Sequence, residues 1–113
     1  MDIVDERILK LVEYFKENKC KDIAVFDLKQ DSNCRYIILL TNANQQANKK
    51  FALTFLNDMQ MQEYPEGYNK GEWIVFDFGQ IVIHAFTPQM RDKYSLDKLY
   101  HSKKVLINKQ NKK

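Results

Sequence analysis

A β-hairpin is predicted for residues 73–86, WIVFDFGQIVIHAF, because two β-rich runs flank Gly79 there. Side chains on a strand alternate between two faces, and a two-residue turn, which is common in hairpins, fixes which residues share a face. One face is then wholly apolar and needs a helix to cover it, whereas a three-residue turn would remove this contrast. The other face mixes aromatic, acidic and imidazole groups: Trp73, Val75, Asp77, Val82, His84 and Phe86.

Two helices and two strands are expected before this hairpin. Asp2 is in position to cap a first helix, and residues 22–28 and 35–41 are β-rich runs that a polar turn separates. Asn42 or Asn44 is in position to cap the second helix. The buried stripe of the first helix is expected to be Val4, Ile8, Leu11, Val12 and Phe15, and that of the second Ala47, Phe51, Phe55 and Met59, with Ala52 and Leu56 beside it.

Proline and glycine residues shape the rest of the chain. Pro65, Gly67 and Gly71 end any helix and leave room for a short edge strand near residues 64–70. Pro88 suits the first position of a third helix, and Ser95 suits the cap of a last helical turn. The 113 residues are therefore expected to form a single domain of the α/β or α+β class, a sheet with helices packed against it.

The net charge of +3 is unevenly distributed. Residues 103–113 carry five lysines and no acid, so residues 1–102 carry 13 basic and 15 acidic side chains, a net charge of −2. We expect residues 1–102 to form the domain and residues 103–113 to be a basic, flexible C-terminal tail. Such a tail is most often a solvated end, although its lysines also suit a weak, sequence-independent contact with RNA phosphate.

The composition argues against membrane and metal proteins. No stretch approaches the roughly 20 apolar residues of a membrane span, and the N-terminus lacks the order of a signal peptide, so a cytoplasmic protein is expected. Cys20 and Cys34 form no CxxC pair, and the chain has only two histidines. No metal site is therefore expected, and both thiols are expected to be reduced.

Motifs for catalysis are also missing. Residues 77–79 spell DFG, but the chain lacks the glycine-rich loop, the VAIK-like strand and the HRD sequence that make this a kinase motif. It contains no phosphate-binding GxGxxG or GxxxxGK[ST] segment. A nucleophilic Cys20 or Cys34 beside His84 or His101 stays open, on weak evidence. We expect a protein that is not an enzyme, with no catalytic residue and no cofactor.

Two interpretations of the mixed hairpin face are open, because a buried carboxylate or imidazole is costly unless it is paired. In the first, Asp77 and His84 form hydrogen bonds with each other or with the backbone and are structural. In the second, the face is partly open, with Trp73 and Phe86 as anchors for a partner and Asp77 as a polar contact. Trp and Tyr are favoured at the centres of protein interfaces.

The hairpin and the segment after it resemble a known family. EGYNKGEWIVFDFGQIVIHAF, followed by TPQMRDKYSLDKLY, is similar to the ribosomal silencing factors, also called the Iojap family. The resemblance covers about residues 5–100, with Asn42 in place of a usual glycine, Asn44 in place of serine and Tyr100 in place of the commoner tryptophan. The matching residues are Glu66, Gly67, Gly71, Trp73, Asp77, Gly79, His84, Phe86, Arg91, Tyr94, Leu96, Asp97, Leu99 and Tyr100.

This resemblance implies a fold and a function. The fold would be a mixed five-stranded sheet flanked by helices, similar to nucleotidyltransferases but without their paired metal-binding carboxylates. The protein would regulate translation by binding ribosomal protein fourteen of the large ribosomal subunit, blocking its joining with the small subunit. The family also implies a role in ribosome assembly and a homodimer. The expected partner-binding residues, each with an alternative role in supporting the fold, are Trp73, Asp77, His84, Phe86, Arg91, Tyr94 and Tyr100.

Two other functions compete with this one. The first is a nucleotidyltransferase-like enzyme or a nucleotide-binding module, for which turnover should depend on Asp77. The second is an RNA-binding factor for assembly of the large subunit that relies on the lysine tail.

Overall fold

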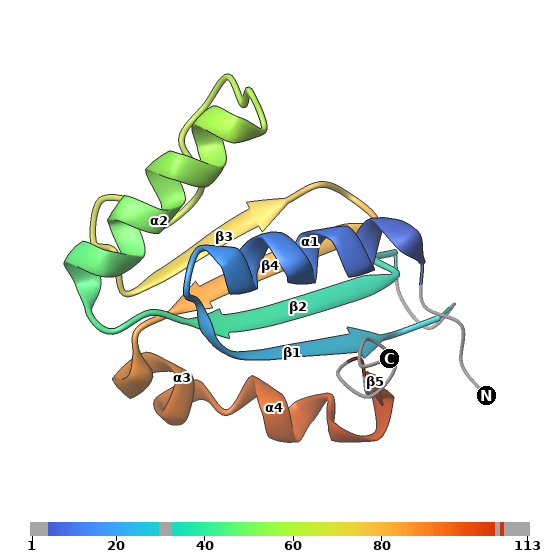
Figure 1. Cartoon of the computed structure of the whole chain (residues 1–113). Coiled ribbons are helices and arrows are strands. Elements are labelled where there is room, and N and C mark those ends of the chain that lie inside the picture. Colours follow the sequence, from blue (N-terminus) through green and yellow to red (C-terminus); the bar gives the residue numbers. More distant parts are fainter. Residues whose placement is uncertain (1–4, 30–32, 106, 108–113) are drawn as a thin grey trace.

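A five-stranded sheet with helices on both faces forms the domain (Figure 1). The computed structural model describes residues 5–29, 33–105 and 107. The strand order is β3-β4-β2-β1-β5, and β2 and β4 are parallel whereas the other neighbours are antiparallel. The strands are β1 (Lys21–Asp27), β2 (Tyr36–Thr41), β3 (Trp73–Asp77), β4 (Ile81–Phe86) and β5 (Lys104–Val105). The expected mixed five-stranded sheet is confirmed.

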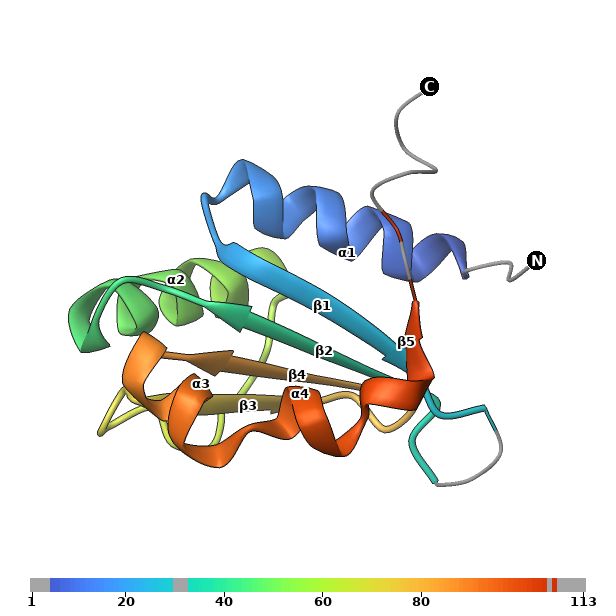
Figure 2. The ribbon, with the colours of Figure 1, turned by 90° about the horizontal axis from the view of Figure 1, so that it is seen from below.

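The helices divide between the two faces of the sheet, as Figure 2 shows from the side. Helices α1 (Glu6–Glu17) and α2 (Gln45–Asp58) cover one face, where they bury the larger core cluster. Helices α3 (Pro88–Tyr94) and α4 (Leu96–Leu99) and a short 3-10 helix (His101–Lys103) lie along the other face. Parallel strands need crossover connections, and the segment with α2 and β3 supplies the crossover from β2 to β4.

The β3–β4 hairpin has the two-residue turn on which the face assignment depends. Asp77 pairs with Val82, and the Phe78 N–H donates to the Ile81 carbonyl at 2.9 Å around the Gly79–Gln80 turn. Gly79 has φ +82°, a backbone conformation that glycine adopts readily. The apolar face expected from a two-residue turn, which comprises Ile74, Phe76, Phe78, Ile81, Ile83 and Ala85, is thereby confirmed, except that Phe78 is 41% exposed. Its buried members are Ile74, Phe76, Ile81, Ile83 and Ala85.

The first helix begins later than the sequence predicted. Asp5, not Asp2, caps α1, and its carboxylate accepts a hydrogen bond from the Arg7 N–H at 2.8 Å. The Arg7 side chain also holds the pKa of Asp5 down at about 2. Asp2 and Val4 lie outside the described residues. The remainder of the predicted stripe faces the sheet, with Ile8, Val12 and Phe15 buried and Leu11 half-buried.

Of the two candidate capping residues of α2, Asn42 and Asn44, the structure confirms Asn44. The Asn44 side chain accepts a hydrogen bond from the Ala47 N–H at 2.8 Å, as a capping residue does. Phe51, Ala52 and Phe55 are buried as predicted. The prediction for Met59 is wrong, because the helix ends at Asp58 and the Met59 side chain is 46% exposed.

Asn42 instead joins a buried polar network that ties α2 to the sheet. Its side-chain amide donates to the side-chain oxygen Oδ1 of Asn48 at 2.9 Å. The fully buried Asn48 amide donates in turn to the backbone carbonyls of Gly71 at 3.0 Å and Ala85 at 2.9 Å. One side chain therefore connects the helix, the end of β2, the loop before β3 and β4.

The fifth strand does not come from the segment that the sequence indicated. Residues 64–70 form only an isolated bridge between Glu66 and Val75, rather than a strand. The β5 strand, Lys104–Val105, pairs with β1 instead, and Val105 and Ile107 are buried. The predicted domain end at residue 102 is thus too early by at least five residues. Residue 106 and residues 108–113, which hold the rest of the predicted tail, lie outside the described residues.

In the segment after the hairpin, the predicted helix start at Pro88 is confirmed, whereas the predicted capping role of Ser95 is wrong. Pro88 begins α3, and Thr87 caps it. Ser95 precedes α4 in a left-handed conformation with φ +49° and makes no side-chain capping bond. Its hydroxyl donates backwards to the Asp92 carbonyl at 2.9 Å. Within the described residues, no helix has the length and apolar character needed to cross a bilayer.

The Asn48 network can be tested by Asn48→Leu, which keeps the size of the side chain. The substitution removes the hydrogen-bond partner of Asn42 and of the Gly71 and Ala85 carbonyls. Each buried polar group left unsatisfied costs about 1–3 kcal/mol, so we expect the free energy of unfolding to fall by about 2–4 kcal/mol in a urea titration. The control is Asn57→Leu at an exposed position of the same helix, which should change it by less than about 0.5 kcal/mol. Equal losses in the two variants would contradict this role.

Candidate functional site

Trp73 and His84 form the centre of the mixed hairpin face. Trp73 lies on the edge strand β3 and His84 on β4, at diagonal positions of the antiparallel pair. The indole Nε1–H of Trp73 donates to Nδ1 of His84 at 3.0 Å. An imidazole that accepts at Nδ1 carries its hydrogen on Nε2 when it is neutral. The hydrogen bond therefore fixes both the indole orientation and the imidazole tautomer.

The imidazole of His84 stays neutral at physiological pH. Burial lowers its pKa from 6.5 to about 4, since the protonated ring would lose its hydration. Protonation would also place a hydrogen on Nδ1, where the Trp73 indole already donates. The His84 ring thus offers the surface a neutral Nε2–H donor rather than a positive charge.

Asp77 does not pair with His84, so this version of the structural interpretation is wrong. Its carboxylate instead accepts a hydrogen bond from the Gly79 N–H at 2.8 Å. Asp77 is exposed at the turn end of β3, where the carboxylate supports the hairpin turn and faces solvent. Sequence reasoning missed Trp73 as the partner of His84.

Phe86 supports the site from below and offers no contact area of its own. Its side chain is 1% exposed and belongs to the smaller core cluster, which α3 and α4 cover. Its ring stacks parallel to the His84 ring, with 6.0 Å between centroids, and lies 5.1 Å from the Trp73 ring. The predicted role of Phe86 as an anchor for a partner is therefore wrong in this conformation.

Tyr94, at the end of α3, completes the exposed aromatic group. Its ring centroid lies 4.8 Å from that of Trp73, and the side chain is 46% exposed. Lys93 Nζ lies 5.5 Å from the centre of the Tyr94 ring, which adds a positive charge at the border of the group. We call Trp73, His84, Phe86 and Tyr94 the aromatic cluster.

Arg91 positions the helix that carries Tyr94. Its guanidinium binds both Asp97 carboxylate oxygens, at 2.7 and 2.8 Å, and donates to the Thr41 hydroxyl at 2.8 Å. The contact with Arg91 lowers the pKa of Asp97. These bonds tie α3 to α4 and to the end of β2. Arg91, at 14% side-chain exposure, supports the fold, and its contact with a partner stays a prediction.

Asp97 and Thr41 were absent from the predicted site. Arg91 and Asp97 are six positions apart, which is not a helical pairing distance. The break at Ser95 between α3 and α4 brings them together. The remaining predicted residue, Tyr100, lies apart from the cluster, because its ring packs at 5.8 Å on Phe26 of β1, two strands from β4.

The site offers contact surface rather than reactive groups. The described residues contain no group of three or more side chains that could hold a metal ion. Burial raises the pKa of the Cys20 thiol to about 12 and also raises that of Cys34, so both thiols stay protonated. A protonated thiol is a poor nucleophile, and the open Cys–His alternative gains no support.

Comparison with known proteins identifies the family. A family model described as "Ribosomal silencing factor during starvation" matches residues 2–113. The chain belongs to the RsfS family. The resemblance inferred from the hairpin and the segment after it is thereby confirmed, and the aromatic cluster is a feature of an RsfS-family domain.

Individual relatives agree with this assignment. The ribosomal silencing factor RsfS of Chromobacterium violaceum is 29% identical over 108 residues, which are 88% of this chain and 86% of that protein. The RsfS of Haemophilus influenzae is 28% identical over 101 residues, 81% of this chain and 99% of that protein. A crystal structure from Chromobacterium violaceum matches with a TM-score of 0.72 at 28% identity, covering 88% of both chains. A Bacillus halodurans structure at 20% identity matches in fold with a TM-score of 0.72, covering 91% of this chain and 100% of that one.

The Trp73–His84 bond predicts an acid transition in the fluorescence of Trp73, the only tryptophan of the chain. The folded pKa of His84 lies below its ordinary value of 6.5. As the pH falls from 6.5 toward 4, the unfolded chain therefore gains a proton that the folded chain does not. Stability is lost in this window, by up to about 1.4 kcal/mol per pH unit. We expect the Trp73 emission of the folded protein to change with a midpoint near pH 4.

Two substitutions separate this titration from others. His84→Gln should abolish the transition, whereas His101→Gln should leave it unchanged. A midpoint near 6.5 in the unsubstituted protein would mean that the imidazole is solvated and that the indole bond does not hold.

Proposed function

We propose that this RsfS-family protein binds ribosomal protein fourteen on the large ribosomal subunit through the aromatic cluster and thereby blocks joining with the small subunit. The observation that carries the proposal is the contact between the partly buried Trp73 and the exposed Tyr94 at the edge of the sheet. The names of the relatives point to the ribosome. Trp and Tyr dominate the energetically important positions of protein interfaces, because they bury a large area around a polar tip.

The cluster is already held in one conformation before binding. Trp73 is fixed by its hydrogen bond to His84, by Phe86 beneath it and by Tyr94 beside it. Ordering a free side chain at an interface costs about 0.5–1.5 kcal/mol. Contacts that lock Trp73 in the free protein lower that cost and favour tight docking on a matching surface.

Blocking of subunit joining needs no chemistry in this mechanism. The domain measures 39 × 29 × 28 Å. Hydrogen bonds and van der Waals contacts between two subunits act over only about 3–4 Å. A body of this thickness on the joining surface of one subunit therefore keeps the other too distant for those contacts. We accordingly propose a regulator that is not an enzyme and that works by occupancy.

Charge complementarity with a basic ribosomal protein is expected to contribute little. The net charge of −2 was assigned to residues 1–102, but Lys103 and Lys104 belong to the domain. Through residue 107 the chain carries 15 basic and 15 acidic side chains. Docking should thus depend mainly on the aromatic cluster, with electrostatics modulating the association rate.

Other features expected from the sequence or implied by the resemblance stay predictions. These are the homodimer, a role in large-subunit assembly, the cytoplasmic location, and a weak contact between the tail and ribosomal RNA. The tail contact now concerns residues 108–113, which hold three lysines.

The contribution of the cluster can be measured with Tyr94→Ala, at an exposed position where the fold should tolerate the change. We expect affinity for isolated large subunits to fall about tenfold, because the loss of an interface aromatic costs about 1–2 kcal/mol or more. Sedimentation with large subunits measures binding, and the yield of joined ribosomes measures inhibition. The matched control, Tyr64→Ala, removes a tyrosine that is 63% exposed and lies outside the cluster, and should change affinity less than about twofold.

Two results would contradict the proposal: equal binding by the Tyr94 and Tyr64 variants, or subunits that join normally at a stoichiometric excess of protein. Trp73→Phe supplies a second variant, which keeps an aromatic ring but loses the indole N–H, and it should bind more weakly than the unsubstituted chain.

Truncation distinguishes the lysine tail from the folded domain. A chain that ends at Ile107 retains β5 and should bind large subunits within about twofold of the full chain, since a solvated tail adds little. A chain that ends at Ser102 lacks the β5 pairing with β1 and should unfold at lower urea concentration. Binding that disappears on removal of 108–113 and depends steeply on salt would favour the RNA-binding alternative.

A further inference from the structure

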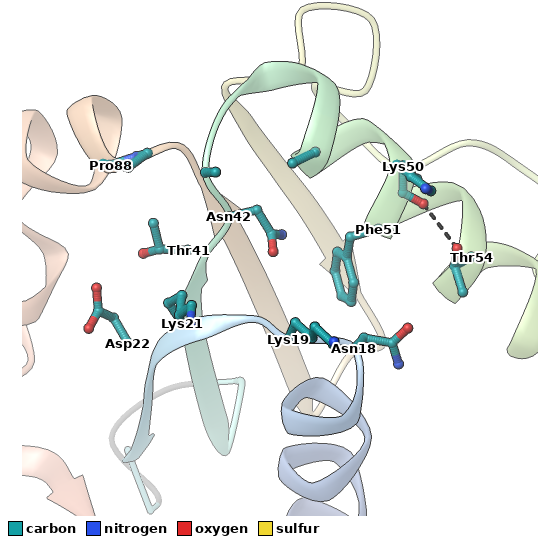
Figure 3. A pocket seen from close by; sticks show the side chains of 12 residues that line it. Asn18, Lys19, Lys21, Asp22, Thr41, Asn42, Lys50, Phe51, Thr54 and Pro88 are labelled. Carbon is teal, nitrogen blue, oxygen red and sulfur yellow. Dashed lines mark hydrogen bonds between the residues drawn. The ribbon is translucent and has the colours of Figure 1, made fainter.

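A cavity opens at the end of the sheet where β2 finishes, as Figure 3 shows. Its volume is about 450 Å³. Thr41 and Asn42 line it from the end of β2, Lys19 from the turn before β1, Lys21 from the start of β1, and Lys50 from α2. Neither Trp73 nor Tyr94 lines this cavity, so it is separate from the aromatic cluster and independent of the proposed ribosome contact.

The topology makes this a natural position for a ligand. The parallel neighbours β2 and β4 end side by side, with Thr41 paired to Phe86. The chain then leaves β2 for α2 on one face of the sheet, and leaves β4 for α3 on the other (Figure 2). Where adjacent parallel strands send their helices to opposite faces, a crevice opens beyond their carboxyl ends, and open α/β sheets bind ligands there.

The cavity is lined by an excess of positive charge. None of the ammonium groups of Lys19, Lys21 and Lys50 takes part in a salt bridge within the part of the chain that the structure describes. Asp22 is the one acidic residue among those that line the cavity, and Figure 3 shows it on the side opposite Lys50. Concave surfaces with charges of one sign focus the electric field and raise the local concentration of the opposite ion.

The rest of the lining is polar at Asn18 and Thr54 and otherwise nonpolar. Ala43, Ala47, Phe51 and Pro88 contribute carbon surface. Pockets that bind small molecules usually combine about 300–1,000 Å³ of mostly apolar space with a few polar groups. A cation-rimmed cavity with a nonpolar wall matches a small ligand that has both phosphate groups and a flat organic part.

We propose that this cavity binds a small phosphorylated ligand of the nucleotide class, with its phosphates at Lys19, Lys21 and Lys50. The lysines act as separate point charges that attract the phosphate oxygens. The nonpolar wall formed by Ala47 and Phe51 receives the organic part. This is a binding site without catalysis, and it goes beyond the proposed ribosome contact.

Calorimetric titration of the full chain with ATP, GTP, inorganic pyrophosphate and adenosine tests the site. We expect saturable binding of the nucleotides and none of adenosine. The triple variant Lys19→Gln, Lys21→Gln, Lys50→Gln should weaken binding at least about tenfold, because charge-assisted phosphate contacts are lost. Its control is Lys10→Gln, Lys70→Gln, Lys104→Gln, which removes the same charge at exposed positions away from the cavity and should change affinity less than about twofold.

A steric variant separates the cavity from general charge. Ala47→Phe keeps every lysine and places a ring in the cavity, so it should also weaken nucleotide binding, while circular dichroism confirms that α2 remains folded. Binding of pyrophosphate as strong as that of the nucleotides would assign recognition to phosphate alone. That result would overturn the nucleotide class and the role of the nonpolar wall, whereas weaker binding of pyrophosphate would support both.

The proposal is overturned if no titration saturates, if adenosine binds as well as ATP, or if both triple lysine variants lose affinity equally. It is also overturned if a single-stranded oligonucleotide binds while all the small ligands fail, because the lysines would then serve a polyanion surface. Each of these results leaves the ribosome contact unaffected, since that contact is measured with Tyr94→Ala on isolated subunits.

Discussion

The turn at Gly79 and Gln80 determines what each side of the β3–β4 hairpin can do. Because the turn has two residues, Ile74, Phe76 and Ile83 all lie on the α1 and α2 side, where they are fully buried. The same parity forces Trp73 and His84 onto the opposite side. A turn longer by one residue would expose half of the apolar set and bury polar groups in its place. The two-residue length of this turn therefore separates the larger core from the aromatic cluster.

The cluster stays partly open because α3 covers only one end of that side. Arg91 holds α3 in place through Asp97 and Thr41, so Tyr94 reaches the Trp73 ring but does not bury it. Beyond this contact, Val75 and Val82 on the same side of the hairpin are only half-buried. The hairpin therefore presents the partly buried Trp73 and the exposed Tyr94 beside a fixed polar donor, the residue types that the proposed ribosome contact requires.

Local signals predicted most of the fold but not its long-range polar contacts. Periodicity, the glycine turn and Pro88 gave the hairpin faces, the stripe at Phe51 and Phe55, and the start of α3. The partner of His84, by contrast, is an indole on the neighbouring strand. Trp73 and Asp77 both lie diagonally across from His84, so the strand register alone does not choose between them, and the Asp77 carboxylate binds the Gly79 N–H instead. The Asn48 network spans positions 37 residues apart. The β5 strand was missed because two residues in a lysine-rich segment show no alternation, and only pairing with β1 orders them.

After the parallel strands β2 and β4 the chain continues to opposite faces of the sheet. This explains why the lysine-lined cavity and the aromatic cluster are separate surfaces. From β2 the chain turns to the α2 side, and from β4 it turns to the α3 side. The divergence opens the lysine-lined cavity between the two strand ends and sends α3 across to the aromatic cluster. Pro88 lies at the wall of the cavity, and Tyr94, at the other end of the same short helix, lies in the cluster. A fold that sent both helices to one face would close the cavity and remove Tyr94 from beside Trp73, so both surfaces derive from this single divergence of the chain.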